Sequence, residues 1–295
     1  MRMSRKRLLF VFAAAGLVLL LGALVTELTG RSFLGPASAQ SSTQKPSGQP
    51  SDQPSERRFG QHFMTVLTSR DADEKQKSLD AIKAGWHPGL VPMSLEIMNF
   101  MRPGPVRSEL AQLMAGLTDS DAAKSGGPND TYFWLWNQPI QAPADYSDFK
   151  ADLFRNIDPK FEHYFRGRQS LARIRLDEIR WGGVKQDGIP PLRNPAMLPA
   201  AQADYLADTD IVFGIAINGD KRAYPKRILA WHEMFTDKIG GVGIAGVYCT
   251  LCGTVIPFRT ELDGTEYELG TSGFLYRSNK LMYDKATQSL WSTTQ

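Results

Sequence analysis

Residues 242–258 of this 295-residue chain read VGIAGVYCTLCGTVIPF, two apolar runs joined by a Cys-x-x-Cys-Gly motif. The run Val242–Tyr248 predicts a strand that ends at Cys249, because β-branched and apolar residues dominate it. A second strand is predicted over Thr254–Leu262, directly after the motif. In thioredoxin-like proteins the first cysteine of such a motif lies at the N-terminus of a helix. A strand in that place excludes a thioredoxin fold.

The residues on either side of these strands predict a mainly antiparallel β domain with one prominent helix. Ile211–Ile217 is a continuous apolar run, which predicts a strand buried on both faces. Lys226–Thr236 follows Pro225 and predicts the helix. Three further segments are predicted to be strands: Glu266–Leu269, Leu275–Tyr283 and Ser289–Ser292. A tight turn at Asp263-Gly264 joins the first of them to the predicted strand Thr254–Leu262.

The part of the chain before this domain has the periodicity of helices. Two sets of apolar residues recur at the spacing of one helical face: Met93, Ile97, Phe100 and Met101, then Leu110, Leu113, Met114 and Leu117. The sequence therefore predicts an α+β fold, with a helical domain at residues 57–180 and a β-rich domain at residues 181–295.

The N-terminus has the features of a targeting segment. A positive stretch from Arg2 to Arg7 precedes the uncharged run Leu8–Val25, and Ala37-Ser38-Ala39 is a small-residue cleavage motif. Two interpretations of residues 1–39 stay open, a cleaved signal peptide and an uncleaved single-span membrane anchor. Both place the remaining chain outside the cytoplasm, in the periplasm or at the cell surface. Residues 40–56, rich in Ser, Gln and Pro, predict a disordered linker.

The distribution of charge argues against nucleic acid as a partner. The whole chain has a formal net charge of +3, and residues 1–39 hold five Lys/Arg and one Glu. Residues 40–295 therefore carry a net charge of −1, without the basic excess that nucleic-acid binding needs. The partners we expect are a membrane, if the N-terminal segment stays uncleaved, and a protein that exchanges electrons with the cysteines.

Several short motifs occur in a fixed order between Trp181 and Gln295. They are Gly188-Ile189-Pro190-Pro191, Ile217-Asn218-Gly219, Arg222-Ala223-Tyr224-Pro225, Trp231-His232-Glu233, Tyr248-Cys249-Thr250-Leu251-Cys252-Gly253-Thr254, Gly270-Thr271-Ser272-Gly273, Leu275-Tyr276-Arg277-Ser278-Asn279, Met282-Tyr283-Asp284 and Ser289-Leu290-Trp291-Ser292. In these motifs and their order, the C-terminal part of the chain resembles the family called domain of unknown function number 3179.

The resemblance implies an exported bacterial protein, and it brings no established activity with it. Some relatives carry selenocysteine within the Cys-x-x-Cys motif, which favours redox chemistry over a structural site. The family's domain also extends beyond the Leu-Trp-Ser motif, so we expect part of it to be missing from this sequence.

The two cysteines of the chain, Cys249 and Cys252, predict thiol–disulfide chemistry that needs no further cofactor. In this hypothesis Cys249 is the attacking thiol, Cys252 is the resolving thiol and His232 carries a proton. Thiolate stabilisation would come from His232 or Arg277, because no helix N-terminus follows the motif.

Two alternatives stay open. In the first, Cys249 and Cys252 bind zinc or copper together with His232 and Glu233, since Cys-x-x-Cys-Gly is also the turn of many metal sites. In the second, the cysteines form a structural disulfide in a non-enzymatic binding module, whose helical domain docks a partner.

Overall fold

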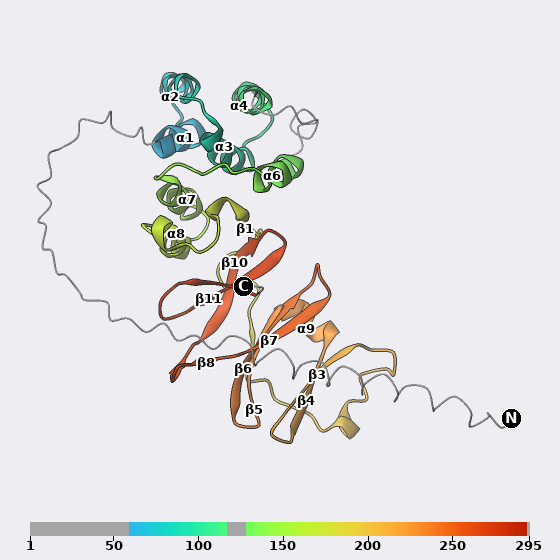
Figure 1. Ribbon diagram of the computed structural model, residues 1–295. Coiled ribbons are helices and arrows are strands. Elements are labelled where there is room, and N and C mark those ends of the chain that lie inside the picture. Colours follow the sequence, from blue (N-terminus) through green and yellow to red (C-terminus); the bar gives the residue numbers. More distant parts are fainter. Residues whose placement is uncertain (1–58, 117–127, 294–295) are drawn as a thin grey trace, which may run out of the picture. The chain divides into compact units, whose positions relative to one another are not determined.

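The computed structural model describes residues 59–116 and 128–293, and Figure 1 draws their helices and strands. The predicted signal or anchor segment and the predicted linker lie outside these residues. Within the described ranges, no helix is both long and apolar enough to cross a membrane.

Short helices make up the described chain as far as residue 165. They are α1 (Phe59–Thr68), α2 (Ala72–Ala84), α3 (Val91–Met98), α4 (Pro105–Ala115), α6 (Pro128–Trp136), α7 (Tyr146–Phe154) and α8 (Glu162–Phe165). Local sequence sets where they start. Asp71 caps α2 by accepting the backbone N–H groups of Asp73 and Glu74, and Pro105 starts α4, where its missing N–H is not needed.

Within the described residues, the β strands form two sheets and two separate hairpins. The first sheet has the order β1 (Ile179–Trp181), β10 (Leu269–Tyr276), β11 (Asn279–Asp284), β12 (Leu290–Ser292) and is antiparallel throughout. The second has the order β2 (Leu192–Arg193), β5 (Met234–Ile239), β6 (Val242–Cys249), β7 (Thr254–Arg259), and its β2–β5 pair is parallel. The hairpins are β3 (Val212–Ile217) with β4 (Asp220–Pro225), and β8 (Glu261–Leu262) with β9 (Thr265–Glu266). Helices followed by mainly antiparallel strands confirm the predicted α+β class.

One hydrophobic core joins the helices to the first sheet. Phe274 of β10 is 1% exposed, and its ring centroid lies 5.0 Å from that of Phe154, 4.8 Å from that of Phe161 and 5.2 Å from that of Phe165. Edge-to-face geometry of this kind adds to the free energy gained by burying the rings. The predicted boundary between residues 180 and 181 falls within β1, which pairs with β10.

A second core holds the helix α9 (Lys226–His232) and the β3–β4 hairpin on the second sheet. Tyr224 of β4 stacks on Phe235 of β5 with ring centroids 3.9 Å apart, and the Tyr224 hydroxyl donates to Asp237 at 2.6 Å. Arg222 donates to the same carboxylate, so a stacked pair and an ion pair fix the hairpin at one place.

Several predicted elements are confirmed, and others begin or end at different residues in the structure. The strand predicted to end at Cys249 is β6, and Asp263-Gly264 forms the predicted turn, between β8 and β9. The predicted helix stops at His232, because Glu233 adopts a left-handed conformation (φ 54°) and the chain continues as β5. The predicted strand Leu275–Tyr283 is interrupted at Arg277, also left-handed (φ 53°), and so forms the hairpin β10–β11.

The prediction that the strand at Ile211–Ile217 is buried on both faces is wrong. β3 alternates exposed and half-buried residues, and Val212 is 42% exposed, because the strand belongs to a two-stranded hairpin. In the helical part, α3 ends at Met98 instead of continuing to Met101. The Phe100 N–H donates to Ile97 O at 2.9 Å, a tight turn that replaces the next helical hydrogen bond.

A fully buried ion pair links helices to the first sheet. Lys150 of α7 pairs with Glu96 of α3 and donates to Ile179 O of β1 at 2.7 Å. The Tyr146 hydroxyl donates to the same Glu96 carboxylate at 3.2 Å. Burial, followed by the charge of Glu96, raises the pKa of Tyr146 well above its usual value, so the phenol stays a donor.

We expect Lys150→Met to lower the free energy of unfolding by about 3–5 kcal/mol, because it leaves the Glu96 carboxylate buried without a cation. The double variant Lys150→Met/Glu96→Gln removes that charge and should recover much of the loss. Urea unfolding of the wild type and both variants measures the difference. A double variant no more stable than the single one would contradict this account.

Candidate functional site

The cysteines lie in the loop that joins β6 to β7, and they form a disulfide with their Cα atoms 5.2 Å apart. The loop residues from Thr250 to Gly253 are exposed, including Leu251 at 77%. Gly253 has a φ of +68°, and its N–H donates to Cys249 O at 2.8 Å. This left-handed position explains why a glycine follows the second cysteine.

The two sulfurs have different surroundings. Cys249 is half-buried at the end of β6, whereas Cys252 is exposed in the loop. The Cys252 backbone N–H donates to Cys249 Sγ at 3.2 Å. Cys252 Sγ lies 4.0 Å from Asn279 Oδ1 at the start of β11. In a reduced protein the N–H would stabilise charge on Cys249, and Asn279 would accept a hydrogen bond from the Cys252 thiol.

A pocket of about 240 Å³ lies beside Cys249. Its apolar wall consists of Val184, Ile189, Phe274 and Leu275, from β10 and the segment that follows β1. Cys249 also lines the pocket, together with its neighbours Thr250 and Leu251 in the loop. The pocket therefore brings the first sheet, the second sheet and one of the two sulfurs together.

Hydrogen bonds fix the apolar wall of this pocket. Trp181 Nε1 donates to Val184 O at 2.8 Å, and Thr271 Oγ1 of β10 donates to Ile189 O at 2.9 Å. Asp187 accepts the backbone N–H of Thr271 at 3.0 Å. The segment after β1 is thus tied to β10, and its side chains keep their place in the wall.

An ion pair between Glu233 and Lys280 also lines the pocket. Both side chains are largely buried, with exposed fractions of 13% and 14%. Glu233 accepts a hydrogen bond from Thr250 Oγ1 at 3.2 Å, so one carboxylate contacts both the cysteine loop and β11. Burial lowers the pKa of Lys280 to about 8, and the adjacent carboxylate favours its charged form.

Two of the predicted site residues make their described contacts with residues other than the cysteines. His232 is half-buried, and its Nδ1 lies 2.9 Å from Pro190 O. Arg277 pairs with Glu178 at 2.9 Å, and its backbone N–H donates to Glu178 O at 2.8 Å. Among the described contacts of His232 and Arg277, none reaches a cysteine.

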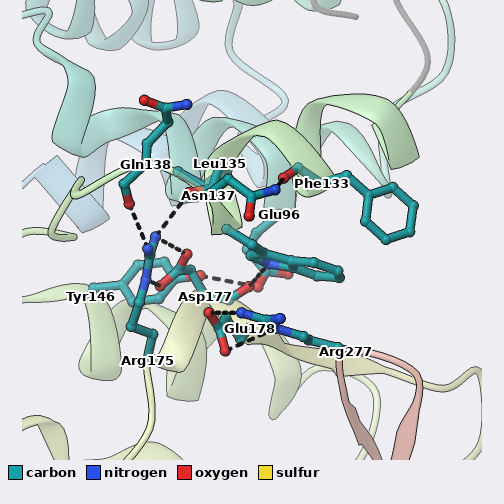
Figure 2. A network of polar contacts seen from close by, with 11 residues as sticks. Glu96, Phe133, Leu135, Asn137, Gln138, Tyr146, Arg175, Asp177, Glu178 and Arg277 are labelled. Atoms are coloured by element: carbon teal, nitrogen blue, oxygen red, sulfur yellow. Dashed lines mark hydrogen bonds and ion pairs between the residues drawn. The ribbon is translucent and has the colours of Figure 1, made fainter.

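Arg277 belongs instead to a polar network between the helices and the first sheet (Figure 2). Arg175 extends this network by donating to Gln138 O at 2.7 Å and pairing with Asp177 at 2.7 Å. Burial alone would raise the pKa of Glu178, but hydrogen bonds from Arg277 and Tyr276 hold that pKa below its usual value. The guanidinium of Arg277 thus compensates a buried carboxylate.

The four residues of the metal hypothesis do not converge on one point. Cys249 and Cys252 are bonded to each other, Glu233 pairs with Lys280, and His232 contacts Pro190. Over residues 59–116 and 128–293, no group of three or more His, Cys, Asp or Glu side chains is placed to hold a metal ion.

Sequence reasoning missed Lys280 and the pocket. Lys280 follows Asn279 in a segment that was predicted to be a strand, where a lysine would ordinarily face solvent. Its burial comes from contacts between two sheets, and no local pattern encodes such contacts. The cysteines and Glu233, in contrast, were identified from their motifs.

Comparison with known protein families agrees with the resemblance found in the sequence. Residues 186–295 match the model of a family described as protein of unknown function (DUF3179). No curated protein and no solved structure was found to match the chain. The match includes the cysteine loop, Glu233 and Lys280, whereas Gly182 and Val184 of the pocket precede it.

We expect Arg277→Met to lower the free energy of unfolding at pH 7 by about 1–3 kcal/mol, because it leaves Glu178 buried without its cation. In the wild type the lowered pKa of Glu178 adds stability above the unfolded-state pKa, and that stability is lost as the pH falls through the folded-state value. In the variant, burial raises this pKa, so the difference between the two proteins should shrink as the pH falls from 7 towards 4.

Urea unfolding at several pH values measures this difference. Arg166→Met is the matched control, since Arg166 forms exposed ion pairs with Asp152 and Glu162 that contribute less than about 1 kcal/mol. A loss in Arg277→Met that does not change with pH would argue against the role given to Glu178.

Proposed function

We propose that this chain, whose residues 186–295 match the DUF3179 family model, catalyses thiol–disulfide exchange at Cys249 and Cys252. One observation carries the proposal: the two cysteines of the chain form a disulfide with Cys249 at a pocket and Cys252 exposed to solvent. A bonded pair placed this way can be reached from two sides. Thiol–disulfide exchange requires such access to the sulfur under attack.

The reaction begins from the reduced protein. The Cys249 thiolate attacks one sulfur of a substrate disulfide, forms a mixed disulfide with it and releases the other substrate sulfur as a thiolate, which takes up a proton. The Cys252 thiolate then attacks Cys249 Sγ. The protein disulfide re-forms, and the first substrate sulfur leaves as a second thiolate. Two electrons pass from the protein dithiol to the substrate disulfide.

A second dithiol must return these electrons, and we assign it to a protein partner. One thiolate of the partner attacks the exposed Cys252 Sγ, which releases Cys249 as a thiolate. The second partner thiol then displaces Cys252, so the partner leaves as a disulfide and the protein is reduced again. The predicted export supports the need for such a partner, because thiols outside the cytoplasm tend to be oxidised.

Local geometry supports Cys249 as the attacking thiol. Its thiolate would accept the Cys252 backbone N–H, a charge-assisted hydrogen bond that favours the ionised form. A helix N-terminus is not needed for this contact. His232 remains a predicted proton carrier: since Pro190 O only accepts, His232 Nδ1 carries the hydrogen and Nε2 is left to take up a proton.

If the disulfide only stabilises the fold, its removal should lower the stability of the protein. A disulfide that closes so short a loop contributes roughly 2 kcal/mol through chain entropy. The loop also has contacts that do not depend on this bond, namely Gly253 N–H to Cys249 O and Thr250 to Glu233. These contacts support a loop that keeps its place when the disulfide opens.

We expect Cys252→Ser to trap a mixed disulfide between Cys249 and a small disulfide such as hydroxyethyl disulfide, because the resolving thiol is absent. Cys249→Ser should form such an adduct at least about tenfold more slowly, since its remaining thiol lacks the N–H contact. Intact-mass spectrometry measures the adducts. Each variant should lose no more than about 2 kcal/mol of stability.

The reduction potential of the wild-type pair provides a second criterion. We expect a value that glutathione buffers can titrate. A value below about −300 mV, with no trapped adduct in either variant, would establish a structural disulfide instead.

Metal content tests the remaining alternative on the same proteins. We expect elemental analysis of the purified wild type to find neither zinc nor copper in stoichiometric amount. A stoichiometric metal that disappears in Cys252→Ser would favour the metal hypothesis over thiol exchange.

A further inference from the structure

The pocket beside Cys249 is smaller than a site for a free cofactor or drug-sized ligand. Its volume is about 240 Å³, against roughly 300–1,000 Å³ for ordinary small-molecule sites. A space of this size suits one side chain. A substrate that reacts at Cys249 would therefore place a single side chain in the pocket and leave the rest of its mass outside.

The walls of the pocket favour an apolar side chain. Val184, Ile189 and Leu275 supply an aliphatic surface, and the almost fully buried Phe274 also belongs to the lining. The single lysine of the lining, Lys280, is paired with Glu233, so the pocket has no uncompensated charge. Moving a charged side chain into such a site has a desolvation cost with no partner to offset it.

Exposed apolar side chains on the cysteine loop and near the end of α9 suit a protein more than a small molecule. Leu251, between the two cysteines, is 77% exposed, and Trp231, two residues before Glu233, is 80% exposed. Single exposed apolar residues are common, but exposed aromatic residues are enriched where proteins bind each other. Leu251 also lines the pocket, so a partner that docks on the loop would also contact the pocket.

We propose that the substrate of Cys249 is a cysteine disulfide within a protein, with an apolar residue next to that cysteine that enters the pocket. This inference rests on the proposed thiol–disulfide exchange and adds the substrate class. The substrate cysteine meets Cys249, and its neighbour packs against the apolar side chains of β10 and the segment after β1. The Glu233–Lys280 pair then acts as the specificity element, because it keeps the pocket neutral.

The test uses reduced full-length protein and short peptides whose cysteine carries the same thionitrobenzoate leaving group. The peptides differ only in the residue next to the cysteine, which is Leu, Asp or Lys. Attack on the peptide sulfur releases coloured thionitrobenzoate, so single-turnover rates compare the flanking residues directly. We expect the Leu peptide to react at least about tenfold faster than the other two, as burial of one leucine side chain allows.

The variant Glu233→Gln changes the net charge of the same pocket. It keeps an oxygen that accepts from Thr250 but leaves Lys280 as an unpaired cation. Since burial lowers the pKa of Lys280 only to about 8, the side chain stays mostly protonated at pH 7. The ratio of Asp-peptide to Leu-peptide rates should rise about tenfold in this variant. Val212→Asp, on the exposed strand β3, is the matched control and should keep the wild-type ranking.

Hydroxyethyl disulfide, which is small and uncharged, separates the two proposals. If the reduced protein exchanges with it but treats the three peptides alike, the substrate class is wrong and thiol–disulfide exchange stands. If the protein does not react with it or with any peptide, the proposed function fails and this inference fails with it. A ranking led by the Leu peptide, with the shift in Glu233→Gln, supports both.

Discussion

The packing of Phe274 against the helices is the contact on which the rest of the described structure depends. This side chain of β10 meets the rings of Phe154, Phe161 and Phe165, and it is almost fully buried. Because β10 pairs with both β1 and β11, the position of Phe274 fixes the first sheet relative to the helices. The same residue forms part of the pocket wall. The helices therefore contribute to the site indirectly, by holding the strand that lines the pocket together with Cys249.

The sequence is informative about the site where residues act through their immediate neighbours. The cysteine motif, the strand before it and the Asp263-Gly264 turn were all predicted, since each depends on a few consecutive residues. The fold class followed from the change in periodicity. Predictions failed where a single backbone conformation decides the outcome. Left-handed conformations at Glu233 and Arg277 end a helix and divide a strand, and neither residue type marks such a position in advance.

Long-range contacts set the remaining features of the site. Lys280 is buried because β11 of the first sheet approaches the end of α9, and the two lie 47 residues apart in the chain. Arg277 was one of two residues considered for stabilising the thiolate, and in the structure it compensates the buried Glu178. The sequence shows which residues are charged, but it does not show which charged residues pair with each other. Pairing of this kind depends on how the sheets pack, and packing is decided by the aromatic core rather than by the charged residues.

The Glu233–Lys280 pair has a further physical consequence for the cysteines. Replacing a largely buried ion pair by apolar residues is often neutral for stability, so the effect of the pair lies more in position than in free energy. Glu233 holds Thr250 of the cysteine loop, and Lys280 holds Glu233 on β11. When the disulfide opens, these contacts and the Gly253 hydrogen bond still restrain the loop. In the proposed exchange, two thiols kept close in this way would have a high effective concentration, which favours ring closure after the substrate reacts. The same restraint keeps Cys249 at the pocket, where a bound substrate sulfur would meet it.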